Sequence, residues 1–362
     1  MTKPASKSYD VISELLKERI LFLDGAMGTM IQRYKLEEED FRGELFKDHP
    51  IDLKGNNDLL CLTRPEIITE IHMNYLEAGA DIIETNTFNA NKLSQSDYEL
   101  QHIIPELNKA AAQVARSAAN SFMAKNPERK CFVAGALGPT NKTASLSPDV
   151  NDPAYRGVTF DQLVETYYEQ VKWLVEGGAD IILAETTFDT LNLKAAIYGI
   201  KNFLDEHQTQ LPLMLSATIT DASGRTLSGQ TIEAFWNSVR HAKPISVGIN
   251  CALGAQEMRP YIEELSKIAD CYISCYPNAG LPNPLSETGY DETPEDTSGF
   301  LEEFARSGFI NIVGGCCGTT PDHINALVEK AKSLTPRTVP TIPKATRVSG
   351  LEALNIGENA PF

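Results

Sequence analysis

Eight short apolar segments, distributed along the whole chain, constrain the fold more than any other feature of the sequence. Each is a nearly continuous apolar run that ends in glycine or a polar residue, a pattern typical of strands covered on both faces. Between most of them lie segments with apolar residues at helical spacing. This alternation predicts an α/β fold, a (β/α)8 TIM barrel, with a doubly wound open sheet as the alternative. The segments are residues 20–24, 81–86, 131–138, 180–186, 212–218, 245–250, 271–277 and 309–315.

An internal repeat favours the barrel. The segment EAGADIIETNTF at residues 77–88 resembles EGGADIILAETTF at residues 176–188. In each copy we interpret a helix end, a glycine cap, an apolar strand and then polar residues. Two similar βα units are expected of a barrel built by repetition, and chance similarity of two amphipathic segments is the alternative.

The length of 362 residues suits either one large barrel or two smaller units. We expect an N-terminal extension at residues 1–19, the barrel at 20–332 and a C-terminal linker at 333–362. Pro336, Pro340 and Pro343 favour extended backbone in that linker, for which a frayed terminus is the alternative. The long charged segment 32–62 predicts a loop with short helices.

Composition excludes several functional classes. The 32 Lys and Arg residues against 49 Asp and Glu residues give a net charge of −17, which is unfavourable for binding nucleic acid. No apolar run approaches the roughly 18 residues that span a bilayer, and residues 1–10 do not form a secretion signal. Seven cysteines, an odd number in a long chain, do not indicate a disulfide framework. We therefore predict a cytoplasmic protein with reduced thiols, no nucleic-acid partner and no membrane association.

The segment Gly314-Gly-Cys-Cys-Gly-Thr-Thr-Pro321 carries the strongest chemical pattern. The flanking glycines free the backbone, so the sulfur atoms of Cys316 and Cys317 can both turn toward one ion. Cys251, at the end of another predicted strand, offers a third thiol. Three thiolates with an open fourth position would bind a zinc ion that holds or activates a substrate. Buried core cysteines, or a closed structural zinc site with a fourth protein ligand, are the alternatives.

A second candidate site follows the first predicted strand, at Asp24-Gly-Ala-Met-Gly-Thr29. This turn lacks the lysine of a P-loop, so it does not indicate a phosphate site. Asp24 could receive a substrate ammonium, while backbone N–H groups of the turn that begins at Gly25 receive a carboxylate. Capping of the next helix is the alternative role for Asp24. Glu185 ends an apolar strand, and a buried carboxylate there needs a bound amine or a structural Arg or Lys.

The other cysteines and histidines show no metal-ligand spacing. Cys271 and Cys275 are predicted to be core thiols of a strand. Thr320 and Pro321 predict the start of a helix, and His323 is expected on the surface of that helix.

Several of these motifs together resemble the homocysteine S-methyltransferases, and within that group the homocysteine-binding barrel of cobalamin-dependent methionine synthase. The resemblance extends over about residues 20–330. The matching segments are LDGAMGT at 23–29, ADIIETNTF at 80–88, AET at 184–186, GINC at 248–251, YPNAG at 276–280 and GGCCGTT at 314–320.

The resemblance implies zinc held by Cys251, Cys316 and Cys317, with the homocysteine sulfur as fourth ligand. It also implies that Asp24 and Glu185 lie near the homocysteine amine. The resemblance implies two further substrate-site residues, Gly25 in the turn and Asn278. Asn278 would fill the open metal position when substrate is absent.

The implied methyl donor is methylcobalamin, supplied by another domain. The segment SGLEALNIG at residues 349–357 resembles the connection into the folate-binding barrel of the same enzyme. The chain would then be an N-terminal fragment, with cobalamin-binding and folate-binding domains as partners. The cobalamin motif Asp-x-His-x-x-Gly is matched only by Asp205-Glu-His207 with Gln210 in place of glycine, so we do not expect this chain to bind cobalamin itself.

Two other hypotheses stay open. A stand-alone homocysteine S-methyltransferase would use betaine or S-methylmethionine as donor. A non-catalytic barrel would hold a closed structural zinc that does not exchange a ligand for homocysteine.

Overall fold

The computed structural model describes residues 7–220, 223–286 and 289–357, and its centre is an eight-stranded sheet in which all neighbouring strands are parallel. The strand order is β1-β8-β7-β6-β5-β4-β3-β2, and a parallel bridge between Leu23 and Ile82 joins the two edges. The sheet therefore closes, which confirms the predicted (β/α)8 TIM barrel and excludes the open sheet. Each predicted apolar segment overlaps one strand, and β4, β6 and β7 extend beyond the predicted ends. The strands are β1 (Leu21–Phe22), β2 (Ile82–Glu84), β3 (Phe132–Leu137), β4 (Ile181–Thr187), β5 (Leu213–Ala217), β6 (Ser246–Gly254), β7 (Tyr272–Asn278) and β8 (Ile312–Val313).

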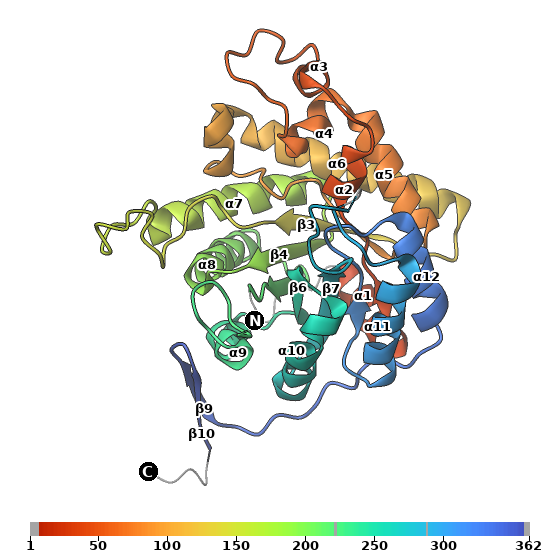
Figure 1. Ribbon diagram of the computed structural model, residues 1–362, viewed down its shortest axis with the longest axis vertical. Coiled ribbons are helices and arrows are strands. Elements are labelled where there is room, and N and C mark those ends of the chain that lie inside the picture. The colour runs from red at the N-terminus through yellow and green to blue at the C-terminus, as the bar shows by residue number, and fades with distance from the viewer. Residues whose placement is uncertain (1–6, 221–222, 287–288, 358–362) are drawn as a thin grey trace.

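Helices surround the strands (Figure 1). Several begin where a threonine side chain caps the first turn, as Thr159, Thr293 and Thr320 do in capping boxes. The prediction of a helix start at Thr320 and Pro321 is thus confirmed. The helices are α1 (Lys7–Glu18), α2 (Met27–Gln32), α3 (Glu38–Arg42), α4 (Leu60–Thr63), α5 (Pro65–Glu77), α6 (Ile104–Lys125), α7 (Phe160–Gly177), α8 (Thr190–Glu206), α9 (Ile232–Val239), α10 (Ala255–Ile268), α11 (Pro294–Arg306) and α12 (Pro321–Ala331).

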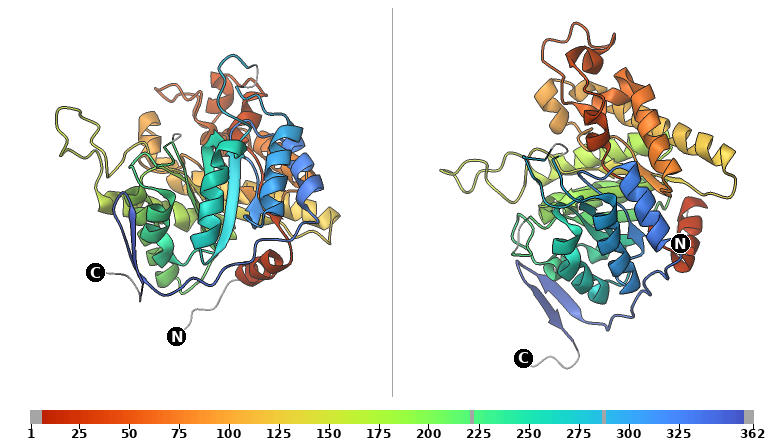
Figure 2. Two further views of the ribbon diagram at one scale, coloured as in Figure 1. Left: turned by 60° about the horizontal axis from the view of Figure 1, so that its bottom comes forward. Right: turned by 45° about the vertical axis from the view of Figure 1, so that its right-hand side comes forward.

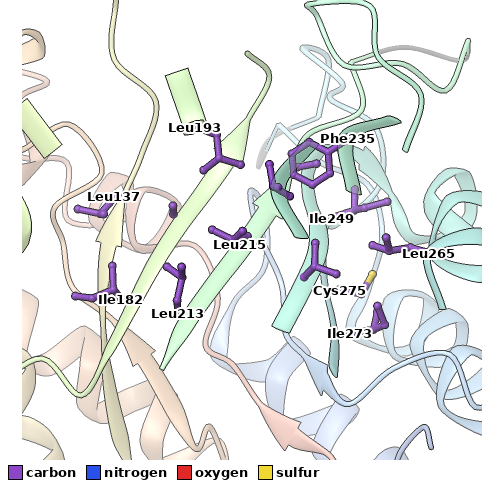
Figure 3. Close-up of a cluster of buried hydrophobic side chains, with 14 of the residues drawn as sticks. Leu137, Ile182, Leu193, Leu213, Leu215, Phe235, Ile249, Leu265, Ile273 and Cys275 are labelled. Carbon is purple, nitrogen blue, oxygen red and sulfur yellow. The ribbon is translucent and has the colours of Figure 1, made fainter. Parts of the chain in front are cut away.

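The core has two layers because successive side chains of a strand point to opposite faces. Leu21, Ile82, Leu183 and Ile312 belong to a buried cluster inside the barrel. Strand residues next to them in sequence, such as Phe22, Ile182 and Val313, belong to a larger cluster between strands and helices. Figure 3 labels ten members of this cluster: Leu137, Ile182, Leu193, Leu213, Leu215, Phe235, Ile249, Leu265, Ile273 and Cys275.

Helix α1 closes one end of the barrel. Its residues Ile12 and Leu16 are almost fully buried and pack in the cluster of interior barrel residues. Figure 2 shows α1 across the end opposite to the loops that precede α11 and α12. The carboxyl ends of the strands are the other end, which leaves that end for a functional site.

The two copies of the internal repeat have the same local structure. Gly79 and Gly178 both have positive φ, +111° and +108°, directly after α5 and α7. Asp81 then accepts a hydrogen bond from the backbone N–H of Phe22, and Asp180 accepts one from Val133. Each aspartate therefore ties the start of its own strand to the neighbouring strand.

The segment after β1 holds the short helices α3 and α4, as expected for 32–62. After α12 the chain crosses the closed end of the barrel, where the buried Arg337 donates to the backbone carbonyls of Ser266, Ala269 and Cys271. It then forms an antiparallel hairpin, β9 (Thr346–Ser349) and β10 (Ala353–Ile356), beside α9 (Figure 1).

The hairpin presents its polar face to the barrel. Ser349 and Asn355 hydrogen-bond to Ser238 and Asn237 of α9, at 2.6 and 2.9 Å. On the opposite face, the cross-strand neighbours Val348 and Leu354 are 49% and 57% exposed. Apolar side chains thus point away from the body of the protein.

Within the described ranges, no helix combines the length and apolar character needed to cross a membrane. All seven cysteines are free thiols.

His72 on α5 gives a prediction about stability. It is fully buried, and neither ring nitrogen has a hydrogen-bond partner among the residues that the structure describes. Burial lowers the pKa of His72 from its ordinary 6.5 to about 4. Between these values the unfolded chain binds more protons than the folded chain, so stability falls as the pH falls through this window. We compare the free energy of unfolding of His72→Leu with that of wild type at each pH. The difference should favour the variant by about 2 kcal/mol more at pH 5 than at pH 7.5.

Urea unfolding at both pH values measures this difference. The matched control is His102→Leu at an exposed position, which should keep the wild-type pH dependence. A His72→Leu variant with the same pH dependence as wild type would show that this histidine is not held neutral by burial.

Candidate metal centre and acidic pocket

A cavity of about 340 Å³ opens at the carboxyl ends of the strands, where barrel enzymes place their reactive groups. It is lined by the turn after β1, the ends of β2, β4 and β6, and the turn after β8. The chemically reactive residues along its wall are Asp24, Asp58, Glu84, Glu185, Cys251, Tyr276, Tyr290, Cys316 and Cys317. The structure therefore brings together the three predicted cysteines and both predicted carboxylates.

The three cysteine sulfurs lie within 4.8 Å of one another, although they come from two distant parts of the chain. Cys251 belongs to β6, where the pairing with β7 shifts register between Asn250 and Gly254. Cys251 itself has a left-handed φ of +61°, which turns the side chain out of the regular strand alternation. Cys316 and Cys317 lie in the turn between β8 and α12.

Glycine makes the vicinal pair possible. A Cβ atom on Gly315 would lie 2.2 Å from the Thr319 Oγ1, and Gly318 has φ of +82° against the ring of Tyr290. These glycines let the turn fold tightly enough that both sulfurs approach Cys251, as the sequence pattern predicts.

The donor set fits a zinc ion. Tetrahedral zinc–sulfur bonds of ~2.3 Å place sulfurs about 3.8 Å apart. The Sγ atoms of Cys251 and Cys317 are 3.9 Å apart. Three soft sulfur ligands at one site favour zinc over magnesium or calcium, which prefer oxygen.

The thiols are coupled electrostatically. Hydrogen bonds from Cys251 and then Cys316 lower the pKa of Cys317 to about 3. Hydrogen bonds with Cys251 and then Cys317 hold the pKa of Cys316 well above the usual range of a thiol. A bound cation would replace the protons that these sulfurs share.

Asn250 supports the metal centre from behind. Its Oδ1 accepts hydrogen bonds from the backbone N–H of Thr186 and from the hydroxyl of Ser216. Its Nδ2 donates to the hydroxyl of Thr186 at 2.8 Å and lies 4.0 Å from the Sγ of Cys316. One amide thus joins β4, β5 and β6 and directs an N–H group toward a cysteine sulfur.

Three carboxyl groups in the same cavity, those of Asp24, Glu84 and Glu185, form an acidic wall. Asp24 Oδ2 accepts a hydrogen bond from the backbone N–H of Glu84 at 3.0 Å. Asp24 does not cap α2, whose N-cap residue is Ala26, so the helix-cap alternative is wrong. The side chains of Glu84 and Glu185 are hydrogen-bonded to each other, so one of them holds a proton.

Burial is the main cause that raises the pKa of all three carboxyl groups. For Glu185 the pKa rises to about 7, and its negative charge further raises the pKa of Asp24 and Glu84. Among the described residues that line the cavity, none is Lys, Arg or His. The structural Arg or Lys considered as partner for Glu185 is therefore not among the lining residues, and a cationic ligand would complete this wall.

The turn after β1 lies beside the acidic wall, with Gly25 lining the cavity. A Cβ atom on Gly25 would lie 2.8 Å from the Thr319 side chain and 2.9 Å from the Tyr75 ring. Glycine therefore allows the turn to pack against the base of the metal-site loop.

Asn278 lies behind the cysteine turn. Its Oδ1 accepts the backbone N–H of Cys317 at 3.1 Å, so in this structure the side chain positions the turn. Its role as a metal ligand in the absence of substrate stays a prediction.

Four of the reactive cavity residues are missing from the sequence-based site: Asp58, Glu84, Tyr276 and Tyr290. Glu84 ends β2 in the repeat, so the Glu-Thr pair shared by both copies was a usable signal. Tyr290 lies in the loop between β7 and α11, and its phenol hydrogen-bonds with Cys317. No pattern in the sequence of that loop indicates this contact.

Other cysteines and histidines lie apart from the cavity lining. Cys275 is a fully buried core thiol, as predicted. His323 was expected on the surface of the helix, but the structure shows it buried. Its Nδ1 faces the Thr320 hydroxyl at 2.9 Å and its Nε2 faces the carbonyl of Glu292 at 3.0 Å. The histidine serves as part of the cap of α12.

Comparison with known proteins identifies similar sequences and folds. A family model described as homocysteine S-methyltransferase matches residues 21–331. The homocysteine methyltransferase MmuM from Escherichia coli in its oxidized form is 20% identical with a TM-score of 0.69, covering 90% of this chain and 100% of that one. Its metallated form is 21% identical with the same TM-score and coverage. Its apo form is 21% identical with a TM-score of 0.63, covering 88% and 98%.

Proposed function

The chain belongs to the homocysteine S-methyltransferase family, and from this premise we propose that it binds zinc and homocysteine and activates the homocysteine thiol for methyl transfer, which gives methionine. The observation that carries the proposal is the pairing, in one cavity, of three converging cysteine sulfurs with an acidic wall that lacks a protein cation. A thiol and an ammonium group on one small molecule match these two features.

Cys251, Cys316 and Cys317 would hold the zinc ion and leave one position open to the cavity. When bound, zinc supplies Lewis acidity that removes the proton from an incoming thiol, whose pKa is otherwise ~8.5. The three cysteine thiolates give this site an excess of negative charge, which keeps a neighbouring sulfur electron-rich and nucleophilic. Asn250, held by the backbone N–H of Thr186, would direct its Nδ2 toward the sulfur of Cys316.

Asp24 and Glu185 would bind the substrate ammonium, because their buried carboxyl groups need a positive partner. The backbone N–H groups of the turn at Gly25 would receive the substrate carboxylate, since the turn lines the same cavity. The substrate is then held at both ends, with its sulfur directed to the cysteines.

For the methyl donor we propose methylcobalamin, presented over the barrel mouth by another domain, as in cobalamin-dependent methionine synthase. The support is the resemblance of residues 349–357 to that enzyme's connection to its folate-binding barrel. The outward apolar face of the hairpin, with Val348 and Leu354 exposed, also suits a segment that packs against a neighbouring domain. Cobalamin-binding and folate-binding domains would be partners in a longer, cytoplasmic protein whose cysteines stay reduced.

One observation favours a second candidate function. The barrel alone covers the full chain of MmuM, described as a homocysteine methyltransferase, so no further domain is needed for a protein of that extent. In this alternative the chain itself would transfer a methyl group from S-methylmethionine or betaine. The third hypothesis, a closed structural zinc, requires a fourth protein ligand that stays in place when a thiol is added.

The test measures zinc content and methionine formation from homocysteine with each of three donors: added methylcobalamin, S-methylmethionine and betaine. We expect about one zinc per chain and homocysteine-dependent demethylation of methylcobalamin. Transfer from S-methylmethionine or betaine alone would establish the second candidate instead. Zinc binding without any change in its coordination on adding homocysteine would contradict both and support the structural site.

A further inference from the structure

The substrate site assigned above uses two carboxyl groups of the acidic wall and leaves Glu84 without a role. Asp58, which also lines the cavity, already accepts a hydrogen bond from the backbone N–H of Asn89. Asp24 follows β1, Glu84 ends β2 and Glu185 lies in β4, so three strands each contribute one carboxyl group to the wall. Asp24 contacts the Glu84 backbone at 3.0 Å, and the Glu84 and Glu185 side chains are hydrogen-bonded. All three line the same cavity.

Glu84 and Glu185 both lie near the carboxyl end of a strand of the internal repeat, although not at equivalent positions. Glu84 is three residues after Asp81, and Glu185 is five residues after Asp180. Strands β2 and β4 run parallel with β3 between them, so both carboxyl groups lie at the same mouth of the barrel.

A primary ammonium group has three N–H bonds. A carboxyl group can accept from each, and an acceptor that remains without a partner in a buried site is unfavourable. The described cavity lining offers no Lys, Arg or His to satisfy a third carboxylate. The number of acceptors on the wall therefore matches a primary ammonium better than an N-alkylated one.

We propose that Glu84 is the third acceptor for the substrate ammonium, and that Asp24, Glu84 and Glu185 together select a primary amine. This inference rests on the proposed function, because it takes the ammonium to be that of a homocysteine-like thiol. An N-methyl group would replace one N–H donor with carbon and leave one carboxyl group without its partner. A thiol with no amino group would leave all three without a cationic partner.

The experiment measures Kd by calorimetry for the zinc-loaded chain with homocysteine, N-methylhomocysteine and 4-mercaptobutanoate, which lacks the amino group. Wild type should prefer homocysteine over both. Glu84→Gln keeps the size of the side chain but cannot become a carboxylate when the ammonium binds, so the preference over 4-mercaptobutanoate should fall about tenfold or more, with zinc content unchanged. An unchanged preference in Glu84→Gln, or an equal loss for all three thiols, would overturn the role of Glu84.

A second variant, Glu84→Asp, covers the case in which Glu84→Gln does not fold. It keeps the charge and withdraws it by one methylene group, so the preference should lie between wild type and a variant without the charge. A Glu84→Asp protein that folds and keeps the full wild-type preference would also overturn the inference. If wild type itself binds homocysteine and 4-mercaptobutanoate equally, the proposed ammonium site fails, which differs from a failure of Glu84 alone.

Discussion

Replacing Cys316 with alanine is expected to abolish zinc binding and homocysteine methylation together. The variant leaves two sulfurs, Cys251 and Cys317, at a site that needs three protein ligands to hold zinc with one position open. Loss of supporting residues around a metal costs about 10–100-fold in affinity or activity, so loss of a ligand itself should exceed about 100-fold in both. Zinc is measured by a chromogenic chelator after unfolding, and methionine by chromatography.

The matched control is Cys271→Ala. Cys271 is also a free, partly buried cysteine, but it packs against the hydrophobic core and lies outside the cavity lining. This variant should keep wild-type zinc content and activity. Methylation by a zinc-free Cys316→Ala protein would contradict a role of the metal in catalysis. Loss of zinc in Cys271→Ala would contradict the assignment of zinc to Cys251, Cys316 and Cys317.

The barrel was predictable because strands covered on both faces must be apolar along their whole length, and turns need glycine or polar residues. Segment 131–138, for example, contains β3 almost residue for residue. The convergence of the three cysteines was predictable for a related reason. Cys251 lies in the last part of β6 and Cys316 and Cys317 follow β8, and a barrel brings all strand ends to one mouth.

The rest of the site depends on contacts that local sequence does not encode. Glu84 was visible as a polar residue at a strand end, but its hydrogen bond to Glu185 exists only because β2 and β4 are arranged around one mouth. Tyr290 reaches Cys317 from a loop whose path is set by packing on Gly318. Helix α1 was also missed, because residues 1–19 precede the first strand and its buried face is defined by the closed barrel beneath it.

Asn250 illustrates the same limit and leads to a sharp test. In the sequence it is one polar residue before Cys251. In the structure it is fully buried, and both ends of its amide are used. The Oδ1 accepts from Thr186 and Ser216, which fixes the orientation of the amide and leaves the Nδ2 toward the sulfur of Cys316.

We expect Asn250→Asp to lower zinc affinity by about 10–100-fold, the range found when a residue that supports metal ligands is replaced. The substitution changes the N–H donor that faces Cys316 into a carboxylate oxygen, which repels the thiolate charge that zinc binding requires. Competition with a chelator of known affinity measures the change, and urea unfolding of the zinc-free protein shows whether the fold is retained. Asn237→Asp, on α9 against the C-terminal hairpin, is the matched control and should bind zinc as wild type does. A folded Asn250→Asp protein with wild-type zinc affinity would show that this amide supports the barrel but not the metal centre.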